Sequence, residues 1–295
     1  MFIAKVKNYK DELLTLTQSE DKYQVISIEG LNPPEAQINT MDVSGMDGSR
    51  FNSSKLANRN IVITIKLCGD VETNRIELYN FFVVKEMCTF YFKNTIRDVY
   101  AEGYVESVAC NAFENGTLMQ ISMICPYPYF KDAVLSTIDI SNVSSGFTFP
   151  FSADSNGIPI SNINTTGTTL IENDSDTNCG IVIRAKFKTN ANHFEIENLT
   201  DNSSLKINLA FLENDELIIN TNKGKKYVRV KRNGTLYNVF RYVTIDSVFL
   251  QLLTGENYLR YYIDGYLENF IIIAVQFNKL YRGVWYGKYR NLCTW

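Results

Sequence analysis

The stretch Gly103–Asp132 constrains the fold of this chain more than any other. Strand-like residues alternate on both sides of Asn115-Gly116, a dipeptide that favours a tight hairpin turn. Because Pro126 and Pro128 lack the N–H group that a ladder hydrogen bond requires, we expect strand pairing to end near Cys125. We therefore predict that this hairpin closes a first domain at about residue 131, and that the extended segment after it leads into a second domain.

Length and composition set the class of protein. At 295 residues, of which 45% are hydrophobic, the chain is large enough for two folded domains, each with its own core. The formal net charge of −3 argues against a nucleic-acid-binding protein with a broad basic surface. The densest basic segment, Lys223–Arg232, has apolar residues interleaved with its charges, as expected for a solvated hairpin strand.

The N-terminus has no apolar run of signal-peptide length, and no later run approaches the roughly 20 residues of a membrane-spanning helix. We therefore expect a soluble protein made in a cytoplasm. The six cysteines include no C-x-x-C pair, which favours reduced structural thiols over a zinc or redox site. They are Cys68, Cys88, Cys110, Cys125, Cys179 and Cys293.

Residues 1–131 are predicted to form a β-sheet or barrel with one helix and a hairpin. The clearest strand is Asn60–Leu67, in which every second residue is Ile or Leu and so falls on one face. The predicted helix follows Asp70, a residue type that caps helix N-termini. The residues expected on its buried side are Val71, Leu78, Tyr79 and Phe82.

Met41–Ser54 is a polar segment that contains Asp47-Gly48, a turn signal. We interpret it as an exposed loop, and exposed loops frequently carry contacts to partners. The residues predicted to form an oligomer interface are Asp47, Gly48, Ser49, Arg50 and Phe51.

Residues 132–295 are predicted to form a second, all-β domain. Strand candidates arrive about every 10–12 residues with no helical period, which is typical of a β-sandwich or barrel. They are Ile181–Lys188, His193–Asn198, Leu205–Phe211, Glu216–Thr221, Tyr227–Arg232, Val248–Leu253, Tyr258–Ile263 and Asn269–Phe277. The tail, Tyr281–Trp295, is aromatic and basic and could pack back onto the first domain.

No motif in the sequence indicates catalysis, and we predict no catalytic, cofactor-binding or metal-binding residue. The single histidine, His193, lies in an alternating strand pattern, and neither a nucleophile elbow nor a phosphate-binding loop is present. A glycosidase carboxylate pair is defined by distance in three dimensions, so hydrolysis stays open as a third hypothesis. A sugar-binding β-sandwich is the second hypothesis, and its candidate platform residues are Tyr242, Tyr258, Tyr261 and Tyr262.

The order and spacing of short fragments along the whole chain resemble one known family, the distal tail proteins of long-tailed phages, or siphovirus-type tail component. In the first half the fragments are Ile28–Pro34, Asp47–Ser49, Arg59–Ile63, Asn74-Arg75, Leu78-Tyr79, Arg97–Tyr100, Gly103–Glu106, Gln120–Ser122 and Cys125–Phe130. In the second half they are Pro159–Asn162, Leu217–Thr221, Leu253–Asn257 and Tyr281–Val284. Members of this family also occur in phage-tail-like particles.

The resemblance implies a fold and a structural role rather than an enzyme. The implied fold is mainly β, with an N-terminal ring-forming domain followed by a galectin-like β-sandwich. The implied role is a ring at the tail tip, expected to be hexameric, that connects the tail tube to the baseplate hub and anchors receptor-binding components. Such a ring needs a head-to-tail interface that closes on itself. The alternative is a stand-alone carbohydrate-binding or adhesion protein.

The resemblance also implies partners and a location. The expected partners are further copies of the chain, the tail tube protein, the tape-measure protein, the tail-associated hub protein and receptor-binding proteins. DNA is expected only as passing cargo, with no membrane insertion and no cofactor. The protein would act in the virion tail tip after assembly in the bacterial host cytoplasm. Some family members carry an inserted carbohydrate-binding module, but this chain has no insertion of that size.

Overall fold

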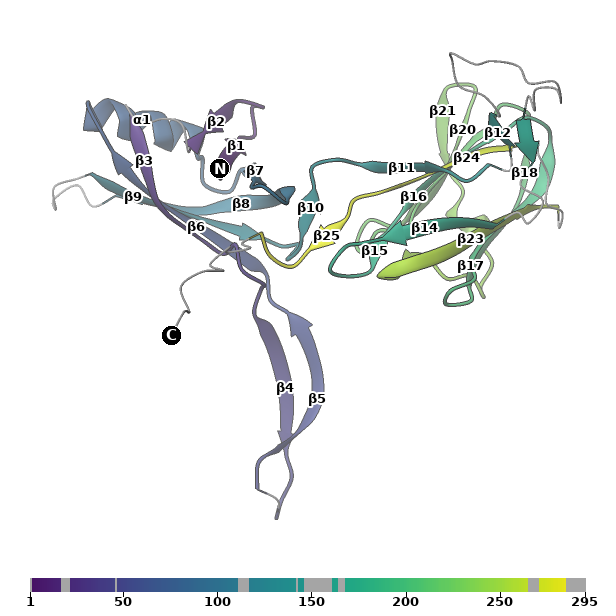
Figure 1. Cartoon of the computed structure of the whole chain (residues 1–295), viewed down its shortest axis with the longest axis horizontal. Helices are drawn as coiled ribbons and strands as arrows, with labels where there is room; N and C mark the ends of the chain where they lie inside the picture. The colour runs from purple at the N-terminus through teal and green to yellow at the C-terminus, as the bar shows by residue number, and fades with distance from the viewer. Residues whose placement is uncertain are drawn as a thin grey trace, which may run out of the picture. The chain divides into compact units, whose positions relative to one another are not determined.

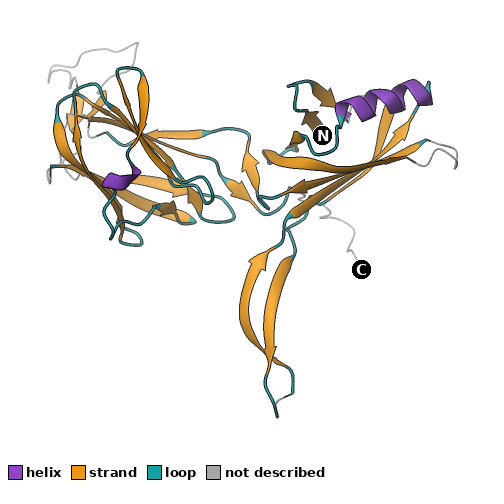
Figure 2. Cartoon of the chain, turned by 180° about the vertical axis from the view of Figure 1, so that it is seen from behind, coloured by secondary structure: helices purple, strands orange, loops and turns teal. Residues whose placement is uncertain are grey.

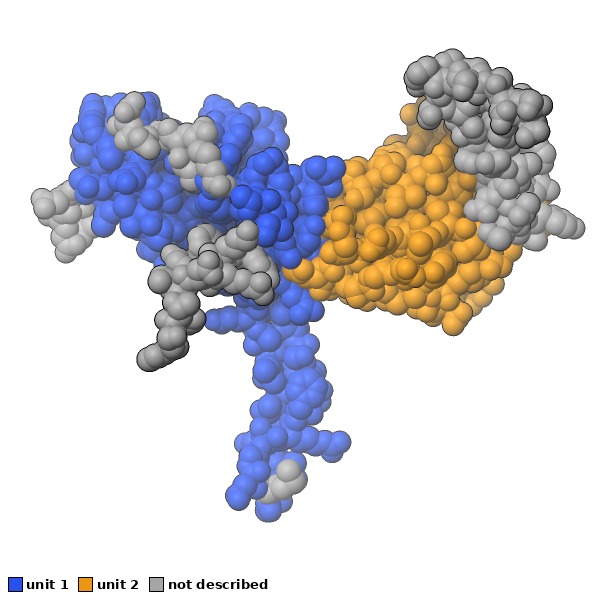
Figure 3. Space-filling model, viewed as in Figure 1, with its two compact units in different colours: residues 1–134, 280–295 blue, residues 135–279 orange. Residues whose placement is uncertain are grey.

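The computed structural model describes residues 2–16, 22–45, 47–110, 117–141, 143–145, 161–163, 168–264 and 271–284. The chain forms two compact units (Figure 3). Unit 1 comprises Met1–Val134 and Leu280–Trp295, and unit 2 comprises Leu135–Lys279. Strands dominate both units (Figure 2), which confirms the predicted mainly-β fold.

Unit 1 is built on a nine-stranded sheet in which the main path runs β2-β1-β7-β8-β9-β6-β3 (Figure 1). Its strands are β1 (Ile3–Lys7), β2 (Leu13–Thr15), β3 (Tyr23–Glu29), β6 (Arg59–Leu67), β7 (Met87–Lys93), β8 (Asp98–Cys110), β9 (Leu118–Cys125), β10 (Phe130–Asp132) and β25 (Leu280–Tyr281). The predicted closing hairpin is the pair β8–β9, which ends at Cys125 opposite Arg59. Its turn at Asn115-Gly116 lies outside the described residues.

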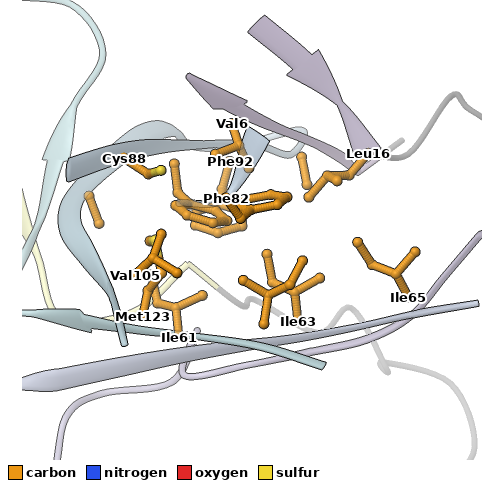
Figure 4. Packing of buried hydrophobic residues seen from close by; sticks show 14 of the residues in the cluster. Val6, Leu16, Ile61, Ile63, Ile65, Phe82, Cys88, Phe92, Val105 and Met123 are labelled. Carbon is orange, nitrogen blue, oxygen red and sulfur yellow. The ribbon is translucent and has the colours of Figure 1, made fainter. Parts of the chain in front are cut away.

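One face of this sheet supplies the core of unit 1 (Figure 4). In β6 the side chains of Ile61, Ile63 and Ile65 are completely buried, as the alternating sequence predicts. Burying such a side chain stabilises the fold by about 1.5–3 kcal/mol, so the alternation fixes which face of the sheet turns inward. The buried rings of Phe90 and Phe92 from β7 join the same cluster.

The helix α1 (Val71–Phe81) covers the core face of the sheet (Figure 1). It begins as predicted, because Asp70 accepts hydrogen bonds from Thr73 N and Thr73 Oγ1. Leu78 and Phe82 are buried, but the prediction was wrong for Tyr79, whose side chain is 39% exposed. Asn74 is buried instead, and its side chain donates a hydrogen bond to Cys68 O at 2.6 Å. This bond connects the first turn of the helix to the segment that precedes it.

Unit 2 is a sandwich of two facing sheets, ordered β11-β24-β16-β19-β20-β21 and β14-β23-β17-β18. Their strands are β11 (Ser136–Asp139), β14 (Thr168–Asn173), β16 (Val182–Phe187), β17 (Ala191–Asn198), β18 (Ser203–Phe211), β19 (Glu216–Asn220), β20 (Tyr227–Arg232), β21 (Thr235–Asn238), β23 (Gly255–Ile263) and β24 (Ile271–Phe277). Phe187 stacks on Phe211 across the interior, with ring centroids 4.2 Å apart.

Small elements complete unit 2. They are the pairs β12 (Val143–Ser145) with β13 (Ser161–Ile163) and β15 (Cys179–Gly180) with β22 (Gln251–Leu252), and the 3-10 helix η2 (Phe240–Tyr242). The predicted strand Val248–Leu253 was wrong in extent, because only Gln251–Leu252 pairs. The strands β14 and β21 were not predicted from the sequence. Seven predicted strands match the observed ones to within a few residues at their ends.

A buried arginine holds together three parts of unit 1 that are distant in sequence. Arg59 is only 2% exposed to solvent. Its guanidinium donates to four backbone carbonyls and lies 4.1 Å from the centroid of the Phe130 ring. The acceptors are Gly30 O, Asn32 O at 2.7 Å, Pro128 O at 2.8 Å and Arg282 O at 2.6 Å. Burial lowers the pKa of Arg59 to about 10, so the guanidinium stays charged at neutral pH.

The returning segment Leu280–Val284 is held on unit 1 by further contacts. Val284 N donates to Leu31 O at 2.9 Å, and Asn94 Nδ2 donates to Val284 O at 2.8 Å. The guanidinium of Arg97 donates to Gly283 O and lies 4.2 Å from the Tyr281 ring centroid. The rest of the predicted tail, from Trp285 onward, lies outside the described residues.

Replacing Arg59 tests how much these four carbonyl contacts stabilise unit 1. Arg59→Lys keeps the charge, but one ammonium group cannot reach acceptors on several sides as a guanidinium does. We expect the free energy of unfolding to fall by about 2–4 kcal/mol, because carbonyls and a charge are left buried without partners. Urea denaturation measures the loss, and hydrogen exchange is expected to rise in Pro128–Asp132 and Leu280–Val284. Arg50→Lys, at an exposed position, is the control, and equal stability of the two variants would contradict the assignment.

Gly30 provides a second test at the same place. Its φ is +82°, and a Cβ built on it would lie 1.9 Å from Asn60 O. Gly30→Ala is therefore expected to lower the free energy of unfolding by more than about 2 kcal/mol, through a steric clash as well as backbone strain. Gly45→Ala is the matched control, because Gly45 has a φ of +81° with nothing within 4 Å. If both variants unfold at the same urea concentration, the close approach does not constrain the fold.

Candidate assembly site

An exposed two-stranded hairpin extends from the sheet of unit 1 (Figure 1). It is formed by β4 (Ala36–Asp42) and β5 (Ser49–Leu56), which pair antiparallel with a bulge next to Asn39. The prediction of a loop over Met41–Ser54 was therefore wrong, since both ends of this segment lie in strands. The strands were missed because they bury neither face, so their sequence has no alternation of apolar and polar residues.

Nearly all of this hairpin is in contact with solvent. Every residue of β4 is exposed, and in β5 only Leu56, at the base, is partly buried. A two-stranded ribbon without a buried face is marginally stable in water. The hairpin would therefore gain stability if another surface covered one of its faces.

The hairpin presents apolar side chains to solvent on both of its faces. Ile38, Met41 and Phe51 have exposed fractions of 63%, 56% and 61%. Phe51 lies opposite Thr40 on one face, and Met41 lies opposite Arg50 on the other. Scattered apolar residues are ordinary on a protein surface, but three on one narrow ribbon favour a contact surface.

The structure places the five predicted interface residues together at the free end of the hairpin. Asp47 and Gly48 lie in the turn, and Ser49, Arg50 and Phe51 begin β5. All five are exposed, and within the described part of the chain Asp47 and Arg50 make no ion pair. Ile38 was not among the predicted interface residues, although an isolated apolar residue in the polar segment after Pro33-Pro34 could have indicated it.

The outer edge of β3 borders a hollow of about 810 Å³ in unit 1. Phe2 and the residues from Val25 to Asn32 line it, and the side chain of Ile26 is 54% exposed. Among the described strands, none pairs with β3 on the side away from β6. This edge is a second surface of unit 1 on which an extended segment could pack.

The described side chains provide no cluster typical of a metal centre. No group of three or more His, Cys, Asp or Glu residues in the described ranges could hold a metal ion. The Nδ1 atom of His193 lies 2.7 Å from Asn208 Oδ1, a contact between neighbouring strands. No described helix is long and apolar enough to cross a membrane.

The five cysteines that the structure describes are free thiols. Burial raises the pKa of Cys88 to about 11 and those of Cys125 and Cys179 to about 12. Because the thiolate is the reactive form, these three side chains are packing residues at neutral pH. Cys293 lies outside the described residues.

The four tyrosines proposed as a sugar platform differ in their exposure to solvent. Tyr261 is 1% exposed and belongs to the core of unit 2. The hydroxyl groups of Tyr258 and Tyr262 donate to Glu256 and Glu197 respectively, at 2.9 Å each. Tyr258 is 41% exposed, and the hydroxyl of Tyr242 accepts a hydrogen bond from Arg241 at 2.7 Å, so burial removes only Tyr261 from the four candidates.

Two protein-family models match the chain. The model described as phage tail protein RIFT-related domain matches residues 12–125. The model described as siphovirus-type tail component, C-terminal domain, matches residues 174–281. No curated protein sequence matches the chain.

Solved phage structures share the fold. The crystal structure of SPP1 Dit, a protein described as a paradigm of the hub adsorption apparatus in phages that infect Gram-positive hosts, has a TM-score of 0.67 and 15% identity. That match covers 95% of this chain and 99% of the other. A chain of the phage P2 baseplate in its activated conformation with Ca has a TM-score of 0.50 and 12% identity, over 95% and 98% of the two chains.

Both halves of the chain thus match domains of phage tail proteins. The structural similarity to SPP1 Dit extends over both halves, so the two proteins share the same fold. The chain belongs to the family of siphovirus-type distal tail proteins, the Dit proteins, which are structural components of the phage tail and baseplate.

Proposed function

We propose that the chain assembles into a closed homohexameric ring at the tail tip and that this ring joins the tail tube to the baseplate hub. The observation that carries the proposal is the exposed β4–β5 hairpin, with apolar side chains on both faces. A ring of identical subunits needs a head-to-tail contact between two different surfaces. The hairpin is one such surface, and the hollow along β3 is a candidate for the other.

In this arrangement the hairpin of one copy packs on unit 1 of the next. The tip residues Asp47–Phe51 reach furthest from the subunit that supplies them, and Ile38 and Met41 follow along the ribbon. Covering these apolar side chains gains about 25 cal/mol for each Å² removed from water. The unpaired backbone edge of β3 offers hydrogen-bonding groups to an arriving strand.

The proposed partners follow from this position in the tail. They are the tail tube protein on one side of the ring, the tail-associated hub protein on the other, the tape-measure protein, and receptor-binding proteins anchored from outside. The ring forms in the host cytoplasm, and DNA crosses it only as cargo. A structural role without catalysis is supported by the family of phage tail and baseplate components to which the chain belongs. The galectin-like description of unit 2 belongs to the same proposal, supported by its two facing sheets.

Introducing charge on the hairpin tests the proposal. We expect Met41→Asp combined with Phe51→Asp to reduce the ring species to below about a tenth of its wild-type population, because the carboxylates would be buried at the interface. Mass photometry measures that population. The melting temperature of the chain should not change, since both residues are exposed.

The matched control carries the same charge change elsewhere on unit 1. Ile76 on α1 and Val84 after it are 55% and 46% exposed, so Ile76→Asp with Val84→Asp alters an equally accessible apolar pair. This control should form rings normally. Unimpaired rings from the hairpin variant, or equal losses from both variants, would contradict a specific role for the hairpin.

A further inference from the structure

The end of the six-stranded sheet in unit 2 carries a concentrated positive charge that the ring does not explain. Residues 223–241 contain seven Lys and Arg residues and no Asp or Glu, within a chain whose net charge is −3. One of the seven, Arg232, is neutralised by the buried Asp215, with Nε 2.9 Å from Oδ1. The other six are exposed.

The outward face of β20 presents part of this charge in a regular pattern. Arg229 and Lys231 are exposed, while Val228 and Val230 between them point into the sandwich. Lys231 lies opposite Leu236 of β21 on one side and Glu216 of β19 on the other. Glu216 is paired with Arg184 at 3.1 Å, so the one carboxylate among these neighbours already has a cationic partner.

Strand β21 ends the sheet and leaves a backbone edge available. Among the described strands it pairs only with β20, and all four of its residues are exposed. Arg232 and Thr235 flank the two-residue turn Asn233-Gly234, so they form the first hydrogen-bonded pair of the hairpin. By alternation, the N–H and C=O groups of Leu236 and Asn238 point away from β20.

Apolar and aromatic side chains lie beside this edge. Leu236, Tyr237 and Phe240 are 52%, 51% and 45% exposed. Phe240 stacks on Phe249 at 5.6 Å, and Lys226 Nζ lies 5.0 Å from the Phe249 ring centroid. The surface therefore combines an unpaired strand edge, apolar side chains and cations, three features of sites that bind an extended peptide.

We propose that this surface, formed by Lys226, Arg229, Lys231, Leu236, Phe240 and Arg241, binds an extended acidic segment of a partner protein as an added strand on β21. Backbone hydrogen bonds to the edge would set the register, and the cations would select carboxylates. The inference rests on the anchoring part of the proposed function and does not require the ring to close.

A protein strand fits these observations better than an anionic polysaccharide does. Both would be attracted by the lysines and arginines. Only a peptide backbone, however, supplies alternating donors and acceptors at the spacing of the exposed groups of Leu236 and Asn238. The two occupants therefore differ in how much they depend on the backbone N–H of residue 236.

The probe is a fluorescent twelve-residue peptide that alternates glutamate with valine or threonine, titrated with the full chain and followed by anisotropy. Dextran sulfate is the polysaccharide probe, and a peptide with lysine in place of glutamate is the charge control. We expect the acidic peptide to bind, the lysine peptide to fail, and the binding to weaken at least tenfold from 50 mM to 500 mM salt, through screening.

Two pairs of variants distinguish the contribution of side-chain charge to peptide binding from that of the backbone hydrogen bonds. Arg229→Glu with Lys231→Glu is expected to weaken peptide binding at least tenfold, whereas Lys10→Glu with Lys66→Glu, an equal charge change in unit 1, leaves it unchanged. Leu236→Pro removes an outward N–H without breaking a bond to β20, and is expected to weaken binding at least tenfold. Leu236→Ala keeps that N–H and should lose less than threefold. Circular dichroism and melting temperatures verify that each variant is folded.

The outcomes decide between the occupants. The expected pattern supports an added acidic strand. If the acidic peptide and dextran sulfate both bind, and Leu236→Pro changes neither affinity, the added-strand proposal is contradicted and the surface binds polyanions in general. No acidic-peptide binding up to 1 mM would overturn the proposal. Ring formation by the Arg229→Glu, Lys231→Glu variant, measured separately, shows whether the proposed assembly is intact, so failure here and failure of the ring are distinguishable.

Discussion

The buried guanidinium of Arg59 is the interaction on which the arrangement of unit 1 depends. Among the described residues no carboxylate forms an ion pair with it, and its hydrogen bonds go to backbone carbonyls that precede the hairpin, follow β9 and lie within the returning segment. A buried charge is costly unless its donors are satisfied, so these segments must stay in place together. The base of the hairpin and the two points at which the chain leaves and re-enters unit 1 are thereby fixed to one side chain.

This constraint explains how an exposed hairpin can have a defined origin. The ribbon β4–β5 has no core of its own, yet it begins beside Gly30 and Asn32, which Arg59 holds, and it ends just before Arg59 itself. Because the base is rigid, the orientation of the exposed arm is already restricted before binding. Less orientational entropy is therefore lost when the arm contacts a neighbour. The Dit family assignment and the ring proposal both fit an arm of this kind, whereas a stand-alone binding module would not require one.

The sequence predicts most of what depends on burial. The alternation in Asn60–Leu67 identified β6, and Asp70 identified the start of α1, because one-sided burial and helix capping are local effects. The role of Arg59 was not predictable, since its acceptors lie between 27 and 223 residues away and are backbone atoms without a sequence signature. The strands β4, β5 and β21 were missed because they bury no face, so their sequences lack the alternation of apolar and polar residues that indicates a strand. The five residues Asp47–Phe51 were located on a turn signal alone, and their contact with another copy stays a prediction.

The most direct test of the assembly is mass photometry of the purified chain, alone and mixed with the tail tube protein, followed by negative-stain imaging of the large species. We expect particles of six times the 33.8 kDa chain mass, or twice that for stacked rings, with a central opening. These particles should be lost in the Met41→Asp, Phe51→Asp variant. A single species at the chain mass, both alone and with the tail tube protein, would contradict the ring assembly.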